Sequence, residues 1–304
     1  MNITSGKIRT PQKVVIYGVE GIGKTTFASK FPDTVFIDTE GSTRFLDVRR
    51  FDAPTSWSML LEQIDYVIRN RPCATLVLDT IDWAEKLCYE HVLAAHNWKS
   101  IEEPGYGSGY RYTYDEMGKL LNRLSDVIDA GVNVVITAHA ALRKFEQPDE
   151  MGSYDRYEMK LQNTPRCNVA AMVKEWADCV LFANYKTIIV KDGKGENAKG
   201  KGRGGERVIY TTHNPCWDAK NRYGLPDEAP FDYSVIAPIM DGAADAPAPK
   251  TVASAPEPAV HAPEPAVHAP VTPEKTSAVM PPTVSNTENV PAQPESEPDR
   301  KSVV

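Results

Sequence analysis

The sequence lacks a long hydrophobic run, paired cysteines and any repeated metal-ligand spacing. Its amino terminus has no apolar core of the kind that signal peptides carry, and no apolar segment is long enough to cross a membrane. The 5 cysteines are scattered without C-x-x-C spacing. His213 and Cys216 form an H-x-x-C pair, but no second pair has zinc-like spacing, so an ordinary loop is the favoured interpretation. These absences predict a reduced, cytoplasmic protein with no membrane association.

Aromatic residues are missing from the carboxyl-terminal part of the chain. From about Ala243 onward the sequence is dominated by Pro, Ala, Glu, Ser, Thr and Val, and it repeats APEPAVH at 255–261 and 262–268. Such a composition cannot bury enough apolar surface to offset the entropy of ordering. We therefore predict one folded domain over residues 1–242 and a disordered, proline-rich tail over 243–304.

The charge balance is close to neutral outside this tail. The tail holds eight acidic and four basic residues, so it contributes −4 of the net charge of −7 and leaves −3 for the folded part. A domain this close to neutrality can carry local basic patches. The charge therefore does not exclude a nucleic-acid partner.

The segment GVEGIGKT at 18–25 fits the phosphate-binding pattern G-x-x-x-x-G-K-[ST]. It follows a short apolar run at 14–17 that predicts a buried strand, which disfavours the alternative of a plain glycine-rich turn with an exposed lysine. The glycines let backbone N–H groups surround a phosphate, Lys24 reaches the β- and γ-phosphates, and Thr25 offers a hydroxyl to Mg²⁺. The helix that begins near Lys24 adds the positive end of its dipole. We expect ATP and Mg²⁺ as cofactors, with nucleotide contacts from Gly18, Gly21, Ile22, Gly23, Lys24, Thr25 and Thr26.

Short apolar runs alternate with helical patterns along the folded part. The runs lie at 35–39, 75–79 and 132–137, and the apolar spacing typical of helices occurs at 57–69, 81–95 and 114–130. This alternation predicts an α/β domain with a mostly parallel sheet, in which ligands gather at the carboxyl ends of the strands.

Two acidic residues at strand ends are candidates for the hydrolytic chemistry. Asp79 takes the place of the Walker B aspartate, which accepts from magnesium-bound water or from Thr25; a cap for the next helix is the alternative. The position after Asp79, where a catalytic glutamate could stand, holds Thr80. Glu40 is therefore the best candidate to orient the attacking water.

This arrangement resembles the RecA-like ATPases, in which a glutamate after the strand that follows the P-loop helix acts as the base. The resemblance gives Lys24 and Glu40 catalytic roles and assigns His139 to the polar sensor of the γ-phosphate, where an ordinary surface histidine is the alternative. It assigns the metal to Thr25 and Asp79.

The chain is more specifically similar to phage-encoded ATP-binding proteins with a minimal RecA-like core, among them the phage single-strand annealing ATPases. The segments that carry this similarity span most of residues 11–230: GVEGIGKTTFASKFP, FIDTEGSTRFLDV, LVLDTIDWAEKL, VVITAHAALRKFE, VKEWADCVLFANYKT and WDAKNRYGLP. We see no match to the amino-terminal polymerisation segment of full-length recombinases. The similarity implies a homo-oligomer in the host cytoplasm. The proline-rich, acidic composition of the tail favours recruitment of a single-strand-binding or replication protein.

Two stretches, at 100–113 and 143–158, do not have the apolar composition of core segments. In RecA-like proteins they correspond to the two DNA-binding loops, and both combine glycine with aromatic and cationic side chains that can stack on unpaired bases and pair with phosphates. The candidate DNA-binding residues are Tyr106, Tyr110, Arg111, Tyr112, Arg143, Lys144, Phe145, Arg156 and Tyr157. The alternative is a pair of surface loops, because acidic residues dilute the positive charge. A third basic stretch, at 191–205, is typical of a flexible hairpin tip. We assign none of its residues to the nucleotide site of a neighbouring subunit.

The resulting prediction is a RecA-like P-loop ATPase that handles single-stranded DNA in phage recombination, by annealing or strand pairing. An ATP-switched loader that acts on a protein partner without gripping DNA is the main alternative. A small-molecule kinase is a third, which the absence of a recognisable arginine-rich lid and the positions of Glu40 and His139 disfavour.

Overall fold

The computed structural model describes residues 5–6, 10–146, 152–192 and 199–240. The predicted disordered tail at 243–304 lies outside these ranges. The tip of the predicted basic hairpin, at 193–198, lies outside them as well. Among the described residues, no helix is long and apolar enough to span a membrane.

The strands and helices alternate as predicted through most of the domain. The strands are β1 (Lys13–Gly18), β2 (Thr34–Asp38), β3 (Arg49–Arg50), β4 (Thr75–Asp79), β5 (Asn133–Glu146), β6 (Ser153–Met159), β7 (Asn163–Thr164), β8 (Cys167–Asn168), β9 (Cys179–Asp192), β10 (Lys199–Tyr210) and β11 (Glu228–Pro230). The helices are α1 (Lys24–Ala28), α2 (Trp57–Asn70), α3 (Ile81–His96), α4 (Ser108–Asp129), α5 (Val169–Trp176) and α6 (Ala237–Met240), with short 3-10 helices η1 (Ser42–Phe45) and η2 (Tyr233–Val235).

The central sheet has the order β11-β10-β9-β1-β5-β4-β2-β3, and β6 pairs with the outer part of β5. All neighbours from β9 to β3 are parallel, whereas β10, β11 and β6 join antiparallel. The P-loop strand β1 is thus separated from β4 by β5. The predicted α/β fold with a mostly parallel sheet and a RecA-like core is confirmed.

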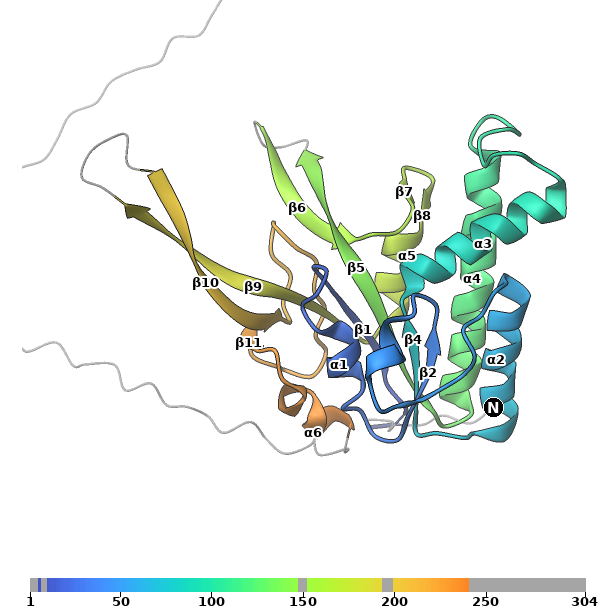
Figure 1. Cartoon of the computed structure of the whole chain (residues 1–304), viewed down its shortest axis with the longest axis horizontal. Coiled ribbons are helices and arrows are strands. Elements are labelled where there is room, and N and C mark those ends of the chain that lie inside the picture. Colours follow the sequence, from blue (N-terminus) through green and yellow to red (C-terminus); the bar gives the residue numbers. More distant parts are fainter. Residues whose placement is uncertain (1–4, 7–9, 147–151, 193–198, 241–304) are drawn as a thin grey trace, which may run out of the picture. The chain divides into compact units, whose positions relative to one another are not determined.

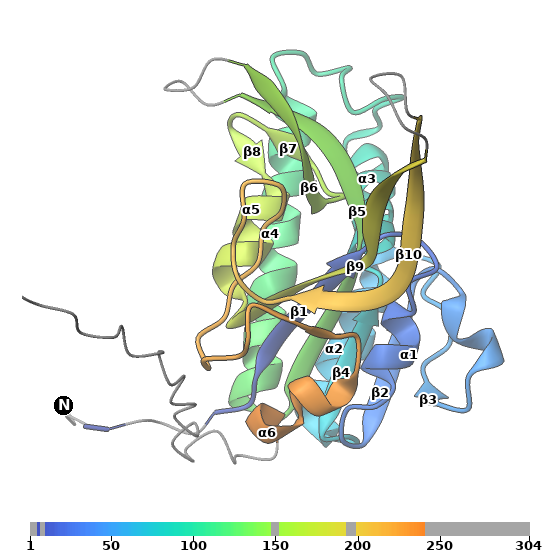
Figure 2. The same cartoon turned by 90° about the vertical axis from the view of Figure 1, so that its left-hand side faces the viewer.

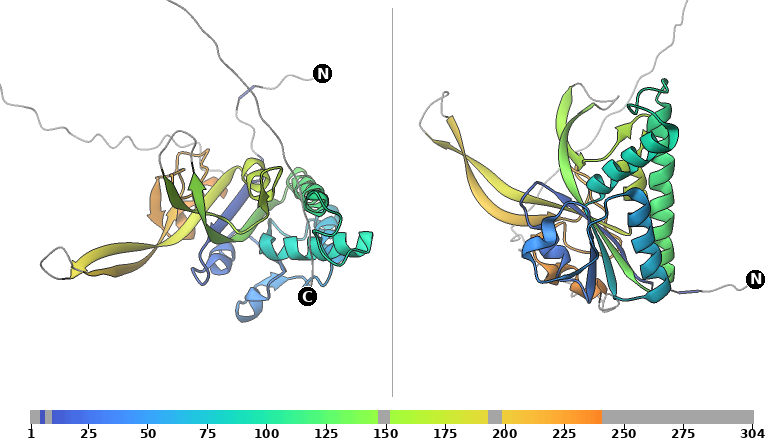
Figure 3. Two further views of the ribbon diagram at one scale, coloured as in Figure 1. Left: turned by 90° about the horizontal axis from the view of Figure 1, so that it is seen from above. Right: turned by 45° about the vertical axis from the view of Figure 1, so that its right-hand side comes forward.

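The middle strands are buried on both faces, as their unbroken apolar sequences require. Val15 and Tyr17 of β1 point to the same side as α2, α3 and α4, while Val14 and Ile16 join a second cluster with α1 and α6. Alternate residues of a strand face opposite sides of a sheet, so β1 serves two cores. The helices on the two faces are seen in Figure 1 and in the right-hand view of Figure 3.

The carboxyl ends of the parallel strands place the candidate site residues at one edge. Gly18 at the end of β1 is level with His139 of β5, and Asp38 at the end of β2 is level with Asp79 of β4. Because parallel strands end at the same edge, polar residues far apart in the sequence meet there.

Two antiparallel hairpins, β5–β6 and β9–β10, extend beyond this edge (Figures 1 and 2). The strand expected at 132–137 is in fact much longer, because β5 continues to Glu146 and pairs with β6 from Ala140 to its end. Exposed and half-buried residues alternate along this extension, as expected for a hairpin with one covered face. The predicted loop at 143–158 is therefore largely a β-hairpin.

Helix α4 also begins earlier than the apolar pattern indicates. It starts at Ser108, after Gly107 in the left-handed conformation, rather than near Tyr114. Close packing fixes this start, since a Cβ on Gly109 would lie 2.0 Å from the carbonyl oxygen of Ile101. The last six residues of the predicted first loop, 108–113, are thus the start of a helix.

Candidate nucleotide-binding site

The P-loop connects β1 to α1, and its glycines serve different purposes. Gly21 and Gly23 adopt the left-handed conformation, with φ of 72° and 105°, which non-glycine residues rarely tolerate. Gly18 has another role, because a Cβ there would lie 2.2 Å from the carbonyl oxygen of Ala183 in β9. The side chain of Ile22 is fully buried, so its contribution to a phosphate site is through the backbone.

Lys24 lies at the start of α1 and points back over the loop. Its ammonium group donates to the carbonyls of Gly18 (3.1 Å) and Val19 (3.2 Å), and the side chain is only 6% exposed. Burial lowers the pKa of Lys24, while the nearby carboxylates of Asp79 and Glu40 oppose this effect. A cation buried against carbonyls and carboxylates is suited to hold the phosphates of a nucleotide.

Thr25 and Asp79 meet as the predicted metal pair requires. The Thr25 hydroxyl donates to Oδ2 of Asp79 at 2.8 Å, and the hydroxyl of Ser42 donates to the same oxygen at 2.5 Å. Thr137 of β5 holds the other carboxylate oxygen. Hydroxyl and carboxylate oxygens are the donors that Mg²⁺ prefers, and this ion is commonly bound through one or two protein oxygens with phosphates and water completing its shell. Ser42 was not predicted, because no motif marks it.

Glu40 is placed by a tight turn after β2. The carboxylate of Asp38 accepts hydrogen bonds from the backbone N–H groups of Gly41 (2.6 Å), Ser42 (3.2 Å) and Thr43 (2.9 Å). Burial raises the pKa of Glu40, and the neighbouring carboxylates of Asp79 and Asp82 raise it further, whereas His139 lowers it. A carboxylate with a raised pKa is a better proton acceptor, which suits a residue that activates water.

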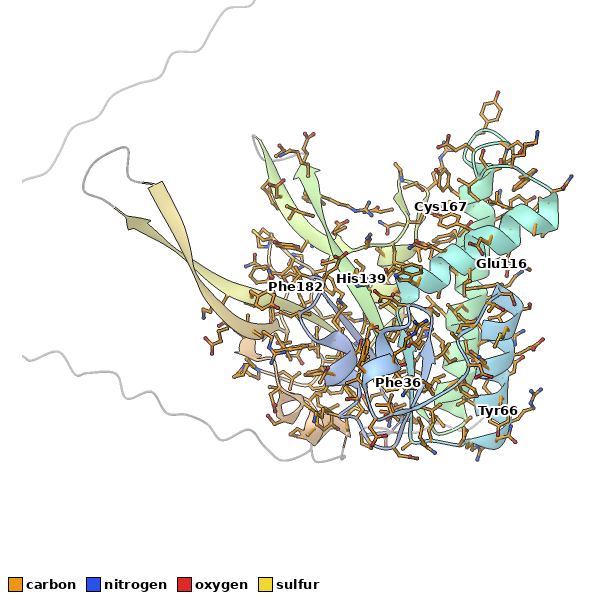
Figure 4. All side chains as sticks on the ribbon, in the orientation of Figure 1. Phe36, Tyr66, Glu116, His139, Cys167 and Phe182 are labelled. Atoms are coloured by element: carbon orange, nitrogen blue, oxygen red, sulfur yellow. The ribbon has the colours of Figure 1, made fainter. Side chains whose placement is uncertain are left out.

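His139 is held by Asp82 of α3. Its backbone N–H donates to Oδ1 of Asp82 at 3.0 Å, and its Nδ1 lies 2.9 Å from Oδ2. Burial opposes ionisation of Asp82, but the hydrogen bonds from His139 outweigh it and lower the pKa of Asp82. The other ring nitrogen, Nε2, lies 3.7 Å from Glu40. His139, labelled in Figure 4, is buried, with 8% of its surface exposed, so it is not an ordinary surface histidine.

These residues line one cavity of about 350 Å³. Its walls include Gly21, Gly23, Lys24, Thr25, Thr26, Glu40, Ser42, Asp79 and His139. The volume falls within the range of small-ligand pockets, and the wall carries a buried ammonium, two hydroxyls paired with a carboxylate, and a P-loop backbone. The residues present therefore fit ATP with Mg²⁺.

A match to a known protein family agrees with this geometry. A family model described as an AAA domain matches residues 10–223. The chain belongs to this AAA domain family. Among solved structures, a KaiC-like protein of the hyperthermophilic archaeon Pyrococcus horikoshii is similar over 66% of this chain and 78% of that chain, at 15% identity and a TM-score of 0.35. No curated protein matches the sequence. The chain is an ATPase domain of the P-loop type.

Two residues of the β9–β10 hairpin reach the P-loop of this AAA domain. The guanidinium of Arg207 donates to the carbonyl of Ile22 at 3.2 Å, and the Tyr185 hydroxyl lies 3.5 Å from the carbonyl of Gly21. Sequence analysis missed both. Their position depends on the parallel pairing of β9 with β1, which no local pattern reveals.

The candidates from the first predicted DNA-binding stretch lie at the α3–α4 junction. Tyr106 is fully exposed, and Arg111 is exposed on the first turn of α4. The Tyr110 hydroxyl donates to Glu102 at 3.2 Å, and Tyr112 packs against His96 and Trp98.

The second stretch divides into exposed and buried residues. Lys144 has a 74% exposed side chain, and Phe145 packs beside Tyr154 on the hairpin. Arg143 is partly engaged, because it donates to the carbonyl of Leu161 at 2.8 Å.

Arg156 and Tyr157 differ from the expectation of side chains available to DNA. The guanidinium of Arg156 is buried and ion-paired with Asp218, and the Tyr157 ring packs 5.2 Å from that of Phe182. Arg156 and Tyr157 are consecutive residues of β6 and face opposite sides of the hairpin, but each is covered on its own side by these contacts. We therefore leave both out of the DNA-binding proposal.

Proposed function

We propose that this AAA domain hydrolyses ATP with Mg²⁺ and binds single-stranded DNA at the edge of the sheet beside the nucleotide site. In this proposal its task is the pairing or annealing of complementary strands. The resemblance to the phage single-strand annealing ATPases supports recombination as the setting.

The hydrolytic part of the proposal depends on the groups around the 350 Å³ cavity. Lys24 and the P-loop backbone hold the phosphates, while Thr25 and Asp79 hold Mg²⁺ directly or through water. Glu40 accepts a proton from the attacking water, and His139 contacts the γ-phosphate. The proposal is supported by the fact that all of these side chains line a single cavity.

The DNA-binding part depends on the continuity of β5. This strand carries His139 within the nucleotide site and Lys144 and Phe145 on the hairpin beyond it. A cation and an aromatic ring are the groups that bind the phosphate and the base of an unpaired strand, and these two consecutive residues offer them on opposite sides of the hairpin. Both residues lie on the same strand as His139, the proposed sensor of the γ-phosphate, and this continuity is the observation that carries the proposal.

The test is fluorescence anisotropy of a labelled oligodeoxythymidylate, measured with ATP and Mg²⁺ at several salt concentrations. Lys144→Ala should lower the slope of log K against log salt by about 0.7, since one phosphate contact is lost. Phe145→Ala should leave that slope unchanged and weaken binding by about 1–3 kcal/mol.

Two controls separate a lost contact from a damaged fold. Lys30→Ala removes an exposed lysine after α1, at the opposite edge of the sheet, and should bind as the parent does. Phe145→Leu keeps apolar volume on the hairpin but removes the stacking face, so it should resemble Phe145→Ala. If the parent domain hydrolyses ATP but does not bind single strands, the DNA-binding part is wrong and a protein partner becomes the better interpretation.

A further inference from the structure

Arg207 of β10 contacts the P-loop without lining the nucleotide cavity. Its guanidinium donates to the carbonyl of Ile22 at 3.2 Å, and a Cβ on Gly23 would lie 3.0 Å from its Nη1. On the neighbouring strand β9, Tyr185 pairs with Arg207 and brings its hydroxyl to 3.5 Å from the carbonyl of Gly21. One cross-strand pair therefore reaches two consecutive carbonyls of the P-loop.

The position of Arg207 is fixed by Phe231, which follows β11. The N–H of Phe231 donates to the carbonyl of Arg207 at 3.0 Å, and the guanidinium lies 5.9 Å from the centre of the Phe231 ring. That ring stacks on Phe27 of α1, with 4.8 Å between the ring centroids, and would lie 3.6 Å from a Cβ on Gly23. We call Arg207 and Phe231 the P-loop clamp, because one holds the loop and the other packs on the helix that follows it.

The orientation of one peptide bond indicates what the P-loop clamp does. In a trans peptide unit, the C=O of one residue and the N–H of the next point in opposite directions. The carbonyl of Ile22 points toward Arg207, so the N–H of Gly23 points the other way, toward the cavity that Gly23 lines. Backbone N–H groups at the start of a helix are the groups that bind a phosphate.

This peptide unit needs support because glycines flank Ile22. Gly21 and Gly23 both tolerate backbone angles that other residues avoid, so the Ile22–Gly23 peptide can turn over at little steric cost. In the turned orientation, a carbonyl oxygen would face the phosphates in place of a hydrogen-bond donor. The hydrogen bond from Arg207 stabilises the orientation that suits a phosphate.

We propose that Arg207 is a positioning residue, which holds the Ile22–Gly23 peptide ready for phosphate before the nucleotide arrives. The inference rests on the proposed role of the P-loop and adds the residue that preorganises it. A loop that is competent only part of the time binds its ligand with a Kd that is larger by the inverse of the competent fraction. Arg207 therefore acts on the affinity for the nucleotide and not on the rate of hydrolysis once the nucleotide is bound.

The test compares the affinities of the full chain for ATPγS, ADP and inorganic tripolyphosphate, each with Mg²⁺, by titration calorimetry. Arg207→Met keeps an unbranched side chain beside the Phe231 ring and removes the guanidinium. We expect Kd to rise about tenfold for all three ligands, which is the scale expected when a partly exposed hydrogen bond from a charged donor is lost. The kcat of ATP hydrolysis at saturating ATP should stay at the value of the parent.

Two further variants separate positioning from a general effect on charge or fold. Arg207→Lys restores a charged donor without the planar guanidinium and should recover part of the affinity. Lys186→Met is the matched control, since Lys186 lies on the same hairpin in an exposed ion pair with Glu228. It removes the same charge, and an exposed ion pair contributes little to stability, so this variant should bind all three ligands as the parent does.

The three ligands show how Arg207 acts. A loss of affinity for ATPγS but not for ADP would mean that Arg207 contacts the γ-phosphate, and a loss for both nucleotides but not for tripolyphosphate would mean that it contacts the base or the ribose. Either result overturns the positioning role, and so do unchanged affinities or a fall in kcat at unchanged Kd.

Failure of this inference is distinguishable from failure of the proposed function. If the parent binds the three ligands but hydrolyses no ATP, the hydrolytic part of the proposed function is wrong, while the affinities still test Arg207. If the parent binds none of them, the nucleotide site itself is wrong and the inference fails with it.

Discussion

Asp82 binds His139 twice, through the backbone N–H at 3.0 Å and through the ring nitrogen Nδ1 at 2.9 Å. Because the pKa of Asp82 is lowered, its carboxylate is an acceptor and Nδ1 carries the proton. The ring is thereby fixed with Nε2 toward Glu40 and the nucleotide cavity.

Asp82→Asn should therefore misorient His139 without touching the nucleotide. We expect kcat for ATP hydrolysis to fall by about 10–100-fold, the range found when carboxylate partners of metal-bound histidines are removed. KM for ATP should remain close to that of the parent, since Lys24 and the P-loop are intact. A proportional rise in KM would show instead that Asp82 maintains the P-loop side of the cavity.

Glu40→Gln preserves the shape of the side chain and removes the proton acceptor. Hydrolysis should fall by about 10²-fold or more, while the affinity for ATP, measured by calorimetry, is retained. Lys24→Ala is the informative comparison, because it removes a phosphate contact and should weaken ATP binding as well. Loss of ATP binding in Glu40→Gln would indicate that the carboxylate supports the turn around Asp38 rather than the reaction.

Gly18→Ala should mainly lower the stability of the fold rather than the rate of nucleotide hydrolysis. The added Cβ would meet the carbonyl oxygen of Ala183 at 2.2 Å, so β1 and β9 would have to separate. Overpacking of this kind costs about 1–3 kcal/mol or more, which should appear as a lower melting temperature. Gly21→Ala meets no atom within 4 Å, although its φ of 72° remains unfavourable, so its melting temperature should fall less. Equal effects would mean that the β1–β9 contact is not tight in solution.

The buried carboxyl of Glu85 should make stability depend on pH. Burial raises the pKa of Glu85 to about 7 from an ordinary value of 4.5, with Asp82 contributing and the Gln162 N–H and Arg143 opposing. Between these two values the folded protein keeps a proton that the unfolded chain has lost, so this group lowers the free energy of unfolding as pH rises through the window.

Glu85→Gln removes that dependence. Relative to the parent, the free energy of unfolding of the variant should be little changed at about pH 5 and up to about 3 kcal/mol higher at about pH 8. Urea unfolding at both pH values measures this difference. The Gln side chain can still accept from the N–H of Gln162. A stability difference that does not change with pH would show that Glu85 is ionised in the folded protein.

Much of this site was accessible from the sequence because its residues sit beside local patterns. The apolar runs before Gly18, Glu40 and Asp79 marked strand ends, and parallel strands bring their carboxyl ends to one edge. Helices α2 and α3 were located within a residue at each end for the same reason, since their apolar spacing is local.

The rest could not be found because it depends on pairing across the chain. The burial of Arg156 is set by its ion pair with Asp218, which is 62 residues away. Gln162 meets Glu85 across 77 residues, and no periodicity in either segment indicates the contact. The extension of β5 past Thr137 was missed because its period-two alternation mixes charged and apolar side chains on a hairpin.

The length of strand β5 beyond His139 has a mechanical consequence. Glu146 lies seven residues beyond His139, which at about 3.4 Å per residue gives an arm of about 24 Å. A tilt of about 5° at His139 would move the end of such an arm by about 2 Å. Ladder hydrogen bonds to β6 stiffen it over most of this length. A sub-ångström adjustment around His139 would thus become a displacement the size of a side-chain contact at the hairpin.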